Sequence, residues 1–281
     1  MVDEPDLRTD PVGSPSALVL PDMRDLPGTL AYSIPGLGEL RADEVLPLAS
    51  VGKLLLLATV ARGFTTGKLD PDEPLDLLDE DYASGSGVLL KLSARRWTLS
   101  DLALLTAAVS DNTATNALLR RVGLEPVTAE AAAAGLEHTR ILDRIREPRL
   151  PEHPPTFAVG TARELASFAS LIAADQTWGP LLLEWMAACT DRSMIPAAIP
   201  HDPEDSSVRE VPVDDVWIAN KTGTDIGMRT DVGVVRGAQQ VCYAVLTQCE
   251  PGHEFEMVLA MREIGAVVGQ LAGAATTNSA S

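Results

Sequence analysis

The sequence has few positive charges for its length of 281 residues. It carries 22 Lys and Arg against 40 Asp and Glu, which gives a formal net charge of −18 and a pI of about 4.5. Binding to nucleic acid or to an anionic membrane surface depends on a concentrated basic surface. We therefore expect neither nucleic acid nor a membrane among the partners of this protein.

Long apolar runs are missing as well. No stretch approaches the roughly 18 consecutive apolar residues that a transmembrane helix needs. The segment 1–6 is acidic and contains a proline, unlike the basic and then apolar start of a secretion signal. These features predict a cytoplasmic protein. Nothing in the sequence indicates an oligomeric state.

Cysteine and histidine are scarce, with three and four copies. Cys242 and Cys249 lie seven residues apart in one expected strand, so they face opposite sides and are too far apart to form a disulfide. We expect free thiols. The histidines lack the spacing of metal ligands, and we expect neither a metal nor a cofactor; they are His138, His153, His201 and His253.

The order of the expected elements predicts an α+β fold. A strand is expected at Gly28–Ile34, and three more at residues 216–219, 232–235 and 241–246, before a final helix at about 254–271. Helices fill the middle of the chain. Strands at both ends of a helical middle predict one shared sheet, with the helices inserted as a second lobe.

Several middle segments have clear local signals. Residues 50–61 are apolar nearly all round, which is typical of a central buried helix. Capping boxes at Thr98 and Thr161 predict helices to about 110 and 174, and a further helix is expected at 112–122. Residues 70–81 hold seven acids and two prolines, and we interpret them as a solvated linker. Segments 1–15 and 201–210 are expected to be disordered and loop-like, respectively.

Three short motifs carry reactive side chains. They are S-x-x-K at Ser50 to Lys53, S-D-N at Ser110 to Asn112, and K-T-G at Lys221 to Gly223. The chain has only four lysines, so the joint probability of all three motifs by chance is on the order of 10⁻⁴. The motifs therefore predict one common site.

The spacing of the first two motifs suits nucleophilic catalysis. One helical turn places Ser50 and Lys53 on the same face, so that the lysine can act as a base for the serine. Lys53 can do so only if its pKa falls, and burial beside a second cation, Lys221, lowers it. We expect Ser110 to pass a proton to a leaving nitrogen and Asn112 to hold a substrate amide.

The remaining candidates would stabilise charge or bind substrate. Ser50, at the start of a helix, has backbone N–H groups and a favourable dipole behind a developing oxyanion. The K-T-G strand supplies a second oxyanion N–H at Thr224. We expect Lys221, Thr222 and Gly223 to form the site for a substrate carboxylate. Arg229 either assists there or is a surface arginine.

These motifs and their flanking residues resemble the class A serine β-lactamases and related penicillin-recognising serine hydrolases. The resemblance covers about residues 25–270 and includes segments 47–53, 98–102, 161–165 and 191–196. It implies the β-lactamase-like fold, an antiparallel sheet flanked by terminal helices with an inserted all-helical lobe and the site between them.

The expected domain organisation follows from this fold. Residues 16–281 are expected to form a single domain. Its α/β lobe would span about 16–48 and 210–272, and its helical lobe about 49–209.

The resemblance also implies a role for Glu147. In the family, a glutamate on an omega-shaped loop activates the water that releases the acyl group, and Glu147 with Pro148 falls at nearly the family spacing. Pro151 replaces the family asparagine that helps to hold this water, and its side chain cannot hydrogen-bond. The alternative for Glu147 is a surface acid paired with Arg144 or Arg146.

Three functions are compatible with these observations. The resemblance implies a serine hydrolase that acts on small β-lactams, or on related amides and esters, through an acyl-enzyme at Ser50, with a role in antibiotic resistance. A second possibility is a penicillin-binding peptidase or esterase that deacylates slowly. The third is a non-catalytic binding domain with the same fold.

Overall fold

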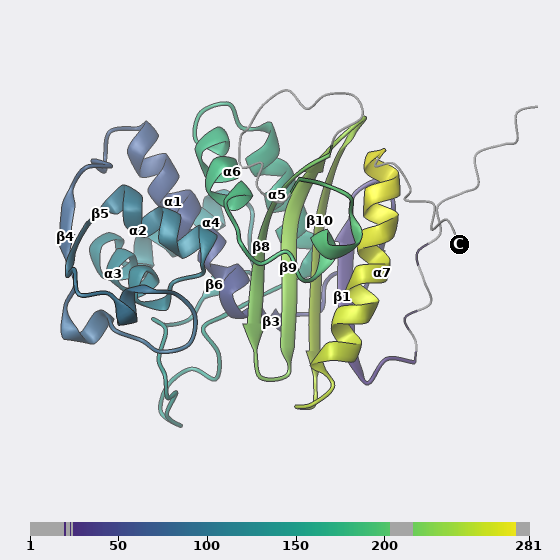
Figure 1. Ribbon diagram of the computed structural model, residues 1–281, viewed down its shortest axis with the longest axis horizontal. Coiled ribbons are helices and arrows are strands. Elements are labelled where there is room, and N and C mark those ends of the chain that lie inside the picture. The colour runs from purple at the N-terminus through teal and green to yellow at the C-terminus, as the bar shows by residue number, and fades with distance from the viewer. Residues whose placement is uncertain (1–19, 21–22, 24, 203–215, 274–281) are drawn as a thin grey trace, which may run out of the picture.

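The computed structural model describes residues 20, 23, 25–202 and 216–273. The expected disorder at 1–15 and most of the expected loop at 201–210 lie outside these residues. Within them, a five-stranded antiparallel sheet lies beside a helical lobe (Figure 1).

The sheet joins the two ends of the chain. Its strand order is β2-β1-β10-β9-β8, and β1 pairs antiparallel with β10. The prediction of one sheet shared by both ends is therefore confirmed. The strands are β1 Gly28–Ile34, β2 Gly38–Leu40, β8 Trp217–Asp225, β9 Met228–Arg236 and β10 Gln240–Cys249.

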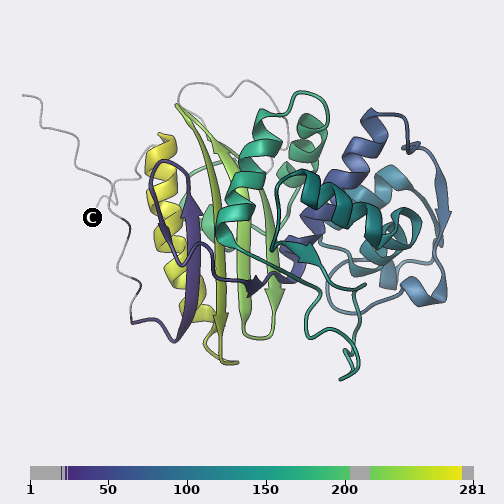
Figure 2. The same ribbon diagram turned by 180° about the vertical axis from the view of Figure 1, so that it is seen from behind.

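Each face of the sheet is covered by an apolar layer. The helix α7, Glu254–Ala272, packs on β9 and β10 on one face, and α5, Ala162–Ala174, packs on the same strands from the other (Figures 1 and 2). Of the terminal helices that were expected to flank the sheet, α7 is the C-terminal one. In the described part of the chain no helix precedes β1.

The helical lobe is built around α1, Lys53–Thr65, and ten of its residues are buried. This confirms the central helix that the apolar segment predicts. Around it lie α2 Leu99–Ala108, α3 Asn112–Val122, α4 Leu124–Ala133 and α6 Gly179–Ala187. Short 3-10 helices occur at η1 Ala49–Gly52, η2 Asp79–Asp81, η3 Leu89–Lys91 and η4 Ile195–Ala198.

Two helices begin at the predicted caps. The Thr98 side chain accepts a hydrogen bond from the Asp101 N–H (3.1 Å), and Thr161 accepts one from the Glu164 N–H (3.2 Å). The Glu164 carboxylate does not turn back to its own helix start. It accepts the N–H groups of residues 137–139 and so attaches that loop to α5.

The acid-rich segment 70–81 is not a solvated linker throughout, so that interpretation is wrong in part. The strand β4, Pro74–Asp76, pairs with β5, Arg96–Thr98. Asp81 is only 1% exposed, because the Arg120 guanidinium compensates its charge at 2.9 Å. A third, small sheet holds β3 Leu46–Pro47, β7 Ala158–Gly160 and β6 Arg140–Ile141.

Two further features concern the described residues. No helix among them is long and apolar enough to cross a membrane. All three cysteines are free thiols, with Cys189 and Cys242 buried and Cys249 half-buried.

Candidate active site

Ser50 lies in η1, between the edge strand β8 and the start of α1. A Cβ atom on Gly223 would lie 2.4 Å from the Leu48 carbonyl oxygen and 3.0 Å from the Ser50 nitrogen. Only glycine therefore lets the K-T-G backbone approach Ser50 this closely. The Thr230 hydroxyl, on β9, donates to the same Leu48 carbonyl (2.8 Å) and fixes the approach.

Lys53 is fully buried and is held by the S-D-N segment. Its Nζ lies 2.7 Å from the Ser110 carbonyl oxygen, 2.8 Å from Asn112 Oδ1 and 3.1 Å from Ser110 Oγ. The Ser50 hydroxyl forms no hydrogen bond with any residue that the structure describes. The expected Ser50–Lys53 pair is thus present as neighbours one turn apart, and not as a direct hydrogen bond.

Lys221 approaches the Ser110 hydroxyl from the side of the sheet. It is fully buried on β8, and its Nζ lies 3.1 Å from Ser110 Oγ and 2.8 Å from the Thr222 carbonyl oxygen. Ser110 Oγ therefore lies between the two lysines. Ser110 adopts a left-handed conformation (φ 55°), with its side chain near both lysines and its carbonyl near Lys53.

The two lysines differ in how strongly their surroundings lower the pKa. Burial holds the pKa of Lys53 well below its usual range, and the positive charge of Lys221 lowers it further, against a weaker opposing effect of Asp111. Burial also lowers the pKa of Lys221, but Cys189, Asp191 and Asp231 oppose that shift. Lys53 is therefore the lysine that loses its proton first.

A neutral Lys53 fits its surroundings. A neutral amine has two N–H bonds and one lone pair. The two carbonyl-type oxygens, on Ser110 and Asn112, can take the two N–H bonds. The lone pair is then directed at the third neighbour, Ser110 Oγ, which can donate its proton to it.

The S-D-N turn is built on Asp111, which is 1% exposed. One carboxylate oxygen accepts the N–H groups of Val88 (2.6 Å) and Leu89 (2.8 Å), and the other caps α3 through the Ala114 N–H (2.9 Å). Asn112 donates to the Ser84 carbonyl (2.7 Å). Asp111 thus acts on the structure of the turn and leaves Ser110 and Asn112 to face the site.

A cavity of about 310 Å³ opens at Ser50. Among the predicted site residues, Ser50, Asn112, Glu147 and Thr224 line its wall, while Lys53, Ser110 and Lys221 lie behind it. The other lining residues are Ala49, Ser84, Gly85, Ser86, Ile145, Arg149, Phe157, Asp225 and Ile226.

Three predicted substrate-binding residues lie apart from this wall, namely Thr222, Gly223 and Arg229. The Arg229 guanidinium donates to the carbonyl oxygens of Asp225 (2.7 Å) and Met228 (2.6 Å), at the β8–β9 turn. The buried Thr222 side chain lies beside the Asp191 carboxylate. Burial alone would raise the pKa of Asp191, but Ser193, Thr222 and Lys221 together lower it.

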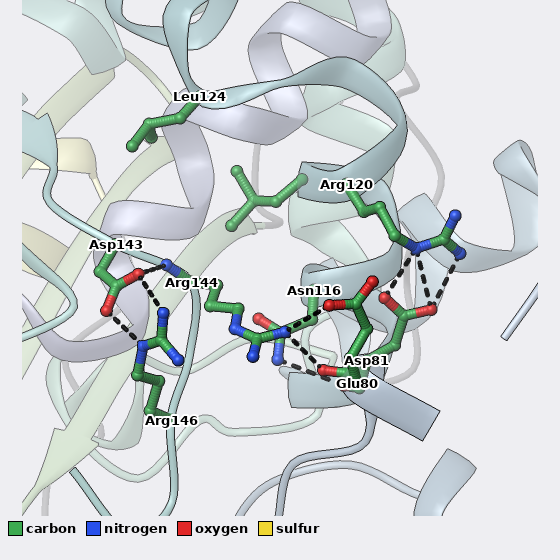
Figure 3. A pocket seen from close by; sticks show the side chains of 9 residues that line it. Glu80, Asp81, Asn116, Arg120, Leu124, Asp143, Arg144 and Arg146 are labelled. Carbon is green, nitrogen blue, oxygen red and sulfur yellow. Dashed lines mark hydrogen bonds and ion pairs between the residues drawn. The ribbon is translucent and has the colours of Figure 1, made fainter. Parts of the chain in front are cut away.

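Glu147 is exposed at the rim of the cavity and forms no hydrogen bond or ion pair with any described residue. The alternative of a paired surface acid is not observed, because Arg144 contacts Glu80 and Arg146 contacts Asp143 (Figure 3).

Asn116 holds this loop, and the sequence analysis missed it. Its amide accepts from the Ile145 N–H (2.8 Å) and donates to the Ile145 carbonyl (2.9 Å). It lies four residues after Asn112, on the same face of α3, and this spacing was the available signal.

The comparisons with known proteins identify the family of the chain. The sequence model of the Beta-lactamase enzyme family matches residues 38–272. A β-lactamase of Streptomyces fradiae is 31% identical over 78% of this chain and 72% of its own length. β-Lactamase L2 of Stenotrophomonas maltophilia is 28% identical over 83% and 76%, respectively.

Solved structures give the same result. The β-lactamase of Sphaerobacter thermophilus DSM 20745 is 28% identical, with a TM-score of 0.75 over 88% of this chain and 92% of that one. PBP-A, at 22% identity and a TM-score of 0.75 over 88% and 91%, shows the shared fold. With its three motifs gathered at one cavity and a family match over most of its length, the chain belongs to the beta-lactamase enzyme family.

Proposed function

We propose that this chain is a serine hydrolase that opens β-lactam rings through an acyl-enzyme on Ser50. The observation that carries the proposal is the position of Ser110 Oγ, 3.1 Å from each of two buried lysines, directly behind the cavity that Ser50 lines. This arrangement supplies a base, a proton relay and a fixed positive charge next to the nucleophile.

The net result of acylation is that one proton leaves Ser50 Oγ and one reaches the ring nitrogen, by three transfers through Lys53 and Ser110. Neutral Lys53 turns its lone pair from Ser110 Oγ to Ser50 Oγ and takes the Ser50 proton as that oxygen forms a bond to the β-lactam carbonyl carbon. Lys53 then returns a proton to Ser110 Oγ, while the Ser110 proton moves to the ring nitrogen and the C–N bond breaks. The backbone N–H groups of Ser50 and Thr224 stabilise the oxyanion.

Substrate binding uses the cavity wall together with the K-T-G residues behind it. Lys221, with Thr222 and Gly223 beside it, provides the positive charge for the substrate carboxylate. The Asn112 amide and the Thr224 backbone hold the acyl amide of the substrate. Arg229 is bound to two carbonyl oxygens, so the proposal does not depend on it.

Deacylation is assigned to Glu147. Its carboxylate takes a proton from water as the water oxygen attacks the ester carbonyl, and the ester oxygen returns to Ser50 with a proton. A slow-deacylating penicillin-binding hydrolase is the second candidate. It is favoured by the exposed, unbound state of Glu147 and by Pro151, which offers no side-chain hydrogen bond to a water.

The decisive measurement is intact mass spectrometry over time after mixing with benzylpenicillin, with product followed in parallel. Rapid product without a lasting adduct supports the β-lactamase, and a stable adduct on Ser50 supports the second candidate. Ser50→Ala should form neither. An adduct on that variant would exclude Ser50 as the nucleophile, and neither adduct nor product with the unmodified protein would indicate a binding domain.

Glu147→Gln separates the two half-reactions. It removes the general base for water but leaves the lysines and Ser50 in place, so deacylation should slow by about 10²-fold or more while acylation changes little. Single-turnover mass spectrometry measures both rates. If the adduct decays equally fast in the variant and the unmodified protein, Glu147 has no part in deacylation.

A further inference from the structure

Glu147 is free although arginines surround it in the sequence. Arg146 precedes it directly, Arg144 lies three residues before it, and Arg149 lies two residues after it. Arg149 also lines the same cavity as Glu147. An exposed carboxylate among three guanidinium groups would ordinarily pair with one of them. Other groups of the protein must therefore bind these arginines away from Glu147.

Asp143 binds two of these arginines. Its Oδ2 accepts a hydrogen bond from Arg146 Nε (2.6 Å), and its Oδ1 accepts one from Arg146 Nη2 (3.3 Å). Arg149 Nη1 lies 3.6 Å from Oδ2 and donates to the Pro154 carbonyl (2.9 Å). One carboxylate therefore binds both arginines that are nearest to Glu147 in the sequence (Figure 3 shows the contact with Arg146).

The third arginine is held by a different group. Arg144 Nη1 donates to the Glu80 carbonyl (2.8 Å) and to its carboxylate (3.3 Å), away from the cavity. Asp143 contributes here too, because its Oδ1 accepts the Arg144 backbone N–H (2.8 Å). The side chains of Glu80, Arg144, Asp143 and Arg146 form the wall of a separate charged pocket behind the loop (Figure 3).

We propose that Asp143 is a positioning residue for deacylation, which binds the guanidinium groups of Arg146 and Arg149 and so keeps them off the Glu147 carboxylate. The inference rests on the proposed role of Glu147 as the base. An arginine paired with Glu147 would occupy the oxygens that must take the proton of water, so the carboxylate would not be free to act as the base.

The charge state of Asp143 suits this role. Burial alone would raise its pKa, but the hydrogen bonds from Arg146 and Arg144 and the charge of Arg149 lower it below its usual value. Asp143 therefore keeps its negative charge at neutral pH. Its side chain is 15% exposed, so solvent screens its contacts with the arginines only in part.

The test compares deacylation of the benzylpenicillin adduct in four variants. Asp143→Asn should slow deacylation by about fivefold, the effect of one surface-type ion pair formed at Glu147, while acylation is unchanged. Asp143→Glu keeps the charge and should stay near the unmodified rate. Asp143→Ser, measured in parallel, keeps the test available if Asp143→Asn does not fold. Asp79→Asn is the matched control, because Asp79 pairs with Arg95 (2.9 Å) outside the cavity.

A rescue experiment distinguishes two roles for Asp143, which are binding the arginines and supporting the structure of the loop. In Asp143→Asn combined with Arg146→Gln and Arg149→Gln, the one neighbouring arginine left in the loop is Arg144, which Glu80 binds away from the cavity, so deacylation should recover. A purely structural role for Asp143 predicts no recovery. The proposal is overturned if Asp143→Asn deacylates at the unmodified rate, or if the triple variant stays as slow as Asp143→Asn.

A comparison with Glu147→Gln separates this inference from the role of Glu147 itself. If Glu147→Gln itself deacylates normally, the role of Glu147 and this inference both fail. If Glu147→Gln is slow but Asp143→Asn is not, only this inference fails.

Discussion

Two buried lysines share one hydroxyl group at the centre of the site. Each Nζ lies 3.1 Å from Ser110 Oγ, and both side chains are fully buried. Two ammonium groups this close repel each other strongly where solvent is excluded, so one of them gives up its proton more easily. Cys189, Asp191 and Asp231 oppose the lowering of the pKa of Lys221, so we expect Lys53 to lose its proton before Lys221 does.

This coupling predicts a shift in the pH dependence of acylation. The neutral form of Lys53 is the base, so acylation should rise with pH through the lowered pKa of Lys53. In Lys221→Gln the second positive charge is gone, the pKa of Lys53 rises, and the acid limb should move to higher pH. Asp111, whose negative charge raises the pKa of Lys53, is unchanged in this variant.

The measurement is the acylation rate with benzylpenicillin as a function of pH, followed by stopped-flow. Lys68→Gln is the control, because Lys68 is exposed and outside the site. An acid limb that stays in place in Lys221→Gln would show that Lys221 does not set the charge state of Lys53.

At the scale of elements, the site depends on the close packing of β8 against η1. A Cβ on Gly223 would meet Thr230 Oγ1 at 2.2 Å as well as the Leu48 carbonyl at 2.4 Å. Gly223→Ala should push the strand away from Ser50, lower stability by about 1–3 kcal/mol and largely abolish acylation.

Thermal unfolding and acylation, measured together, test this expectation. The control is Gly67→Ala, where the glycine has a positive φ of 69° but a Cβ would have open space. That variant should lose about 1 kcal/mol through backbone strain and keep acylation. Normal acylation by Gly223→Ala would mean that the close approach is not required.

The elements that the sequence predicted best have a capping residue at the start and a helix-ending residue at the end. The helix α3 has its expected bounds because the Asp111 side chain caps its start and Gly123 ends it. The helices α4 and α6 were missed. The start of α4 has no side-chain cap, and α6 opens with Gly179-Pro180 and is too uniformly apolar to show a helical period. The strand β4 was hidden by the acid-rich segment around it and by its own exposed acid, Asp76.

The sequence predicted the part of the site that consists of short motifs. The part that depends on how loops pack was harder to predict. Ser50, Lys53, Ser110 and Lys221 come together because their motifs lie on a helix start, a helix cap and an edge strand. The free state of Glu147 depends instead on where neighbouring arginines find partners. No local pattern specifies this, since Arg144 pairs with Glu80, a residue 64 positions away.

At the scale of the whole molecule, the net charge of −18 has the same sign as the charge of the proposed substrate. Common β-lactams carry a carboxylate, so the protein as a whole repels them during diffusion. The charged groups of the cavity wall, Glu147, Arg149 and Asp225, sum to −1, and the cation Lys221 lies behind them. The local field therefore nearly cancels, and we expect the field of the whole molecule to dominate the approach.

Salt should then speed acylation by anionic substrates. The Debye length falls from about 30 Å at 0.01 M to about 10 Å at 0.1 M, which screens distant surface charges but not the contact with Lys221. The second-order acylation constant for benzylpenicillin should rise about two- to threefold between 10 and 200 mM NaCl, whereas that of its neutral methyl ester should stay constant. A constant that falls with salt for benzylpenicillin would show that the buried lysines, and not the net charge, govern the encounter.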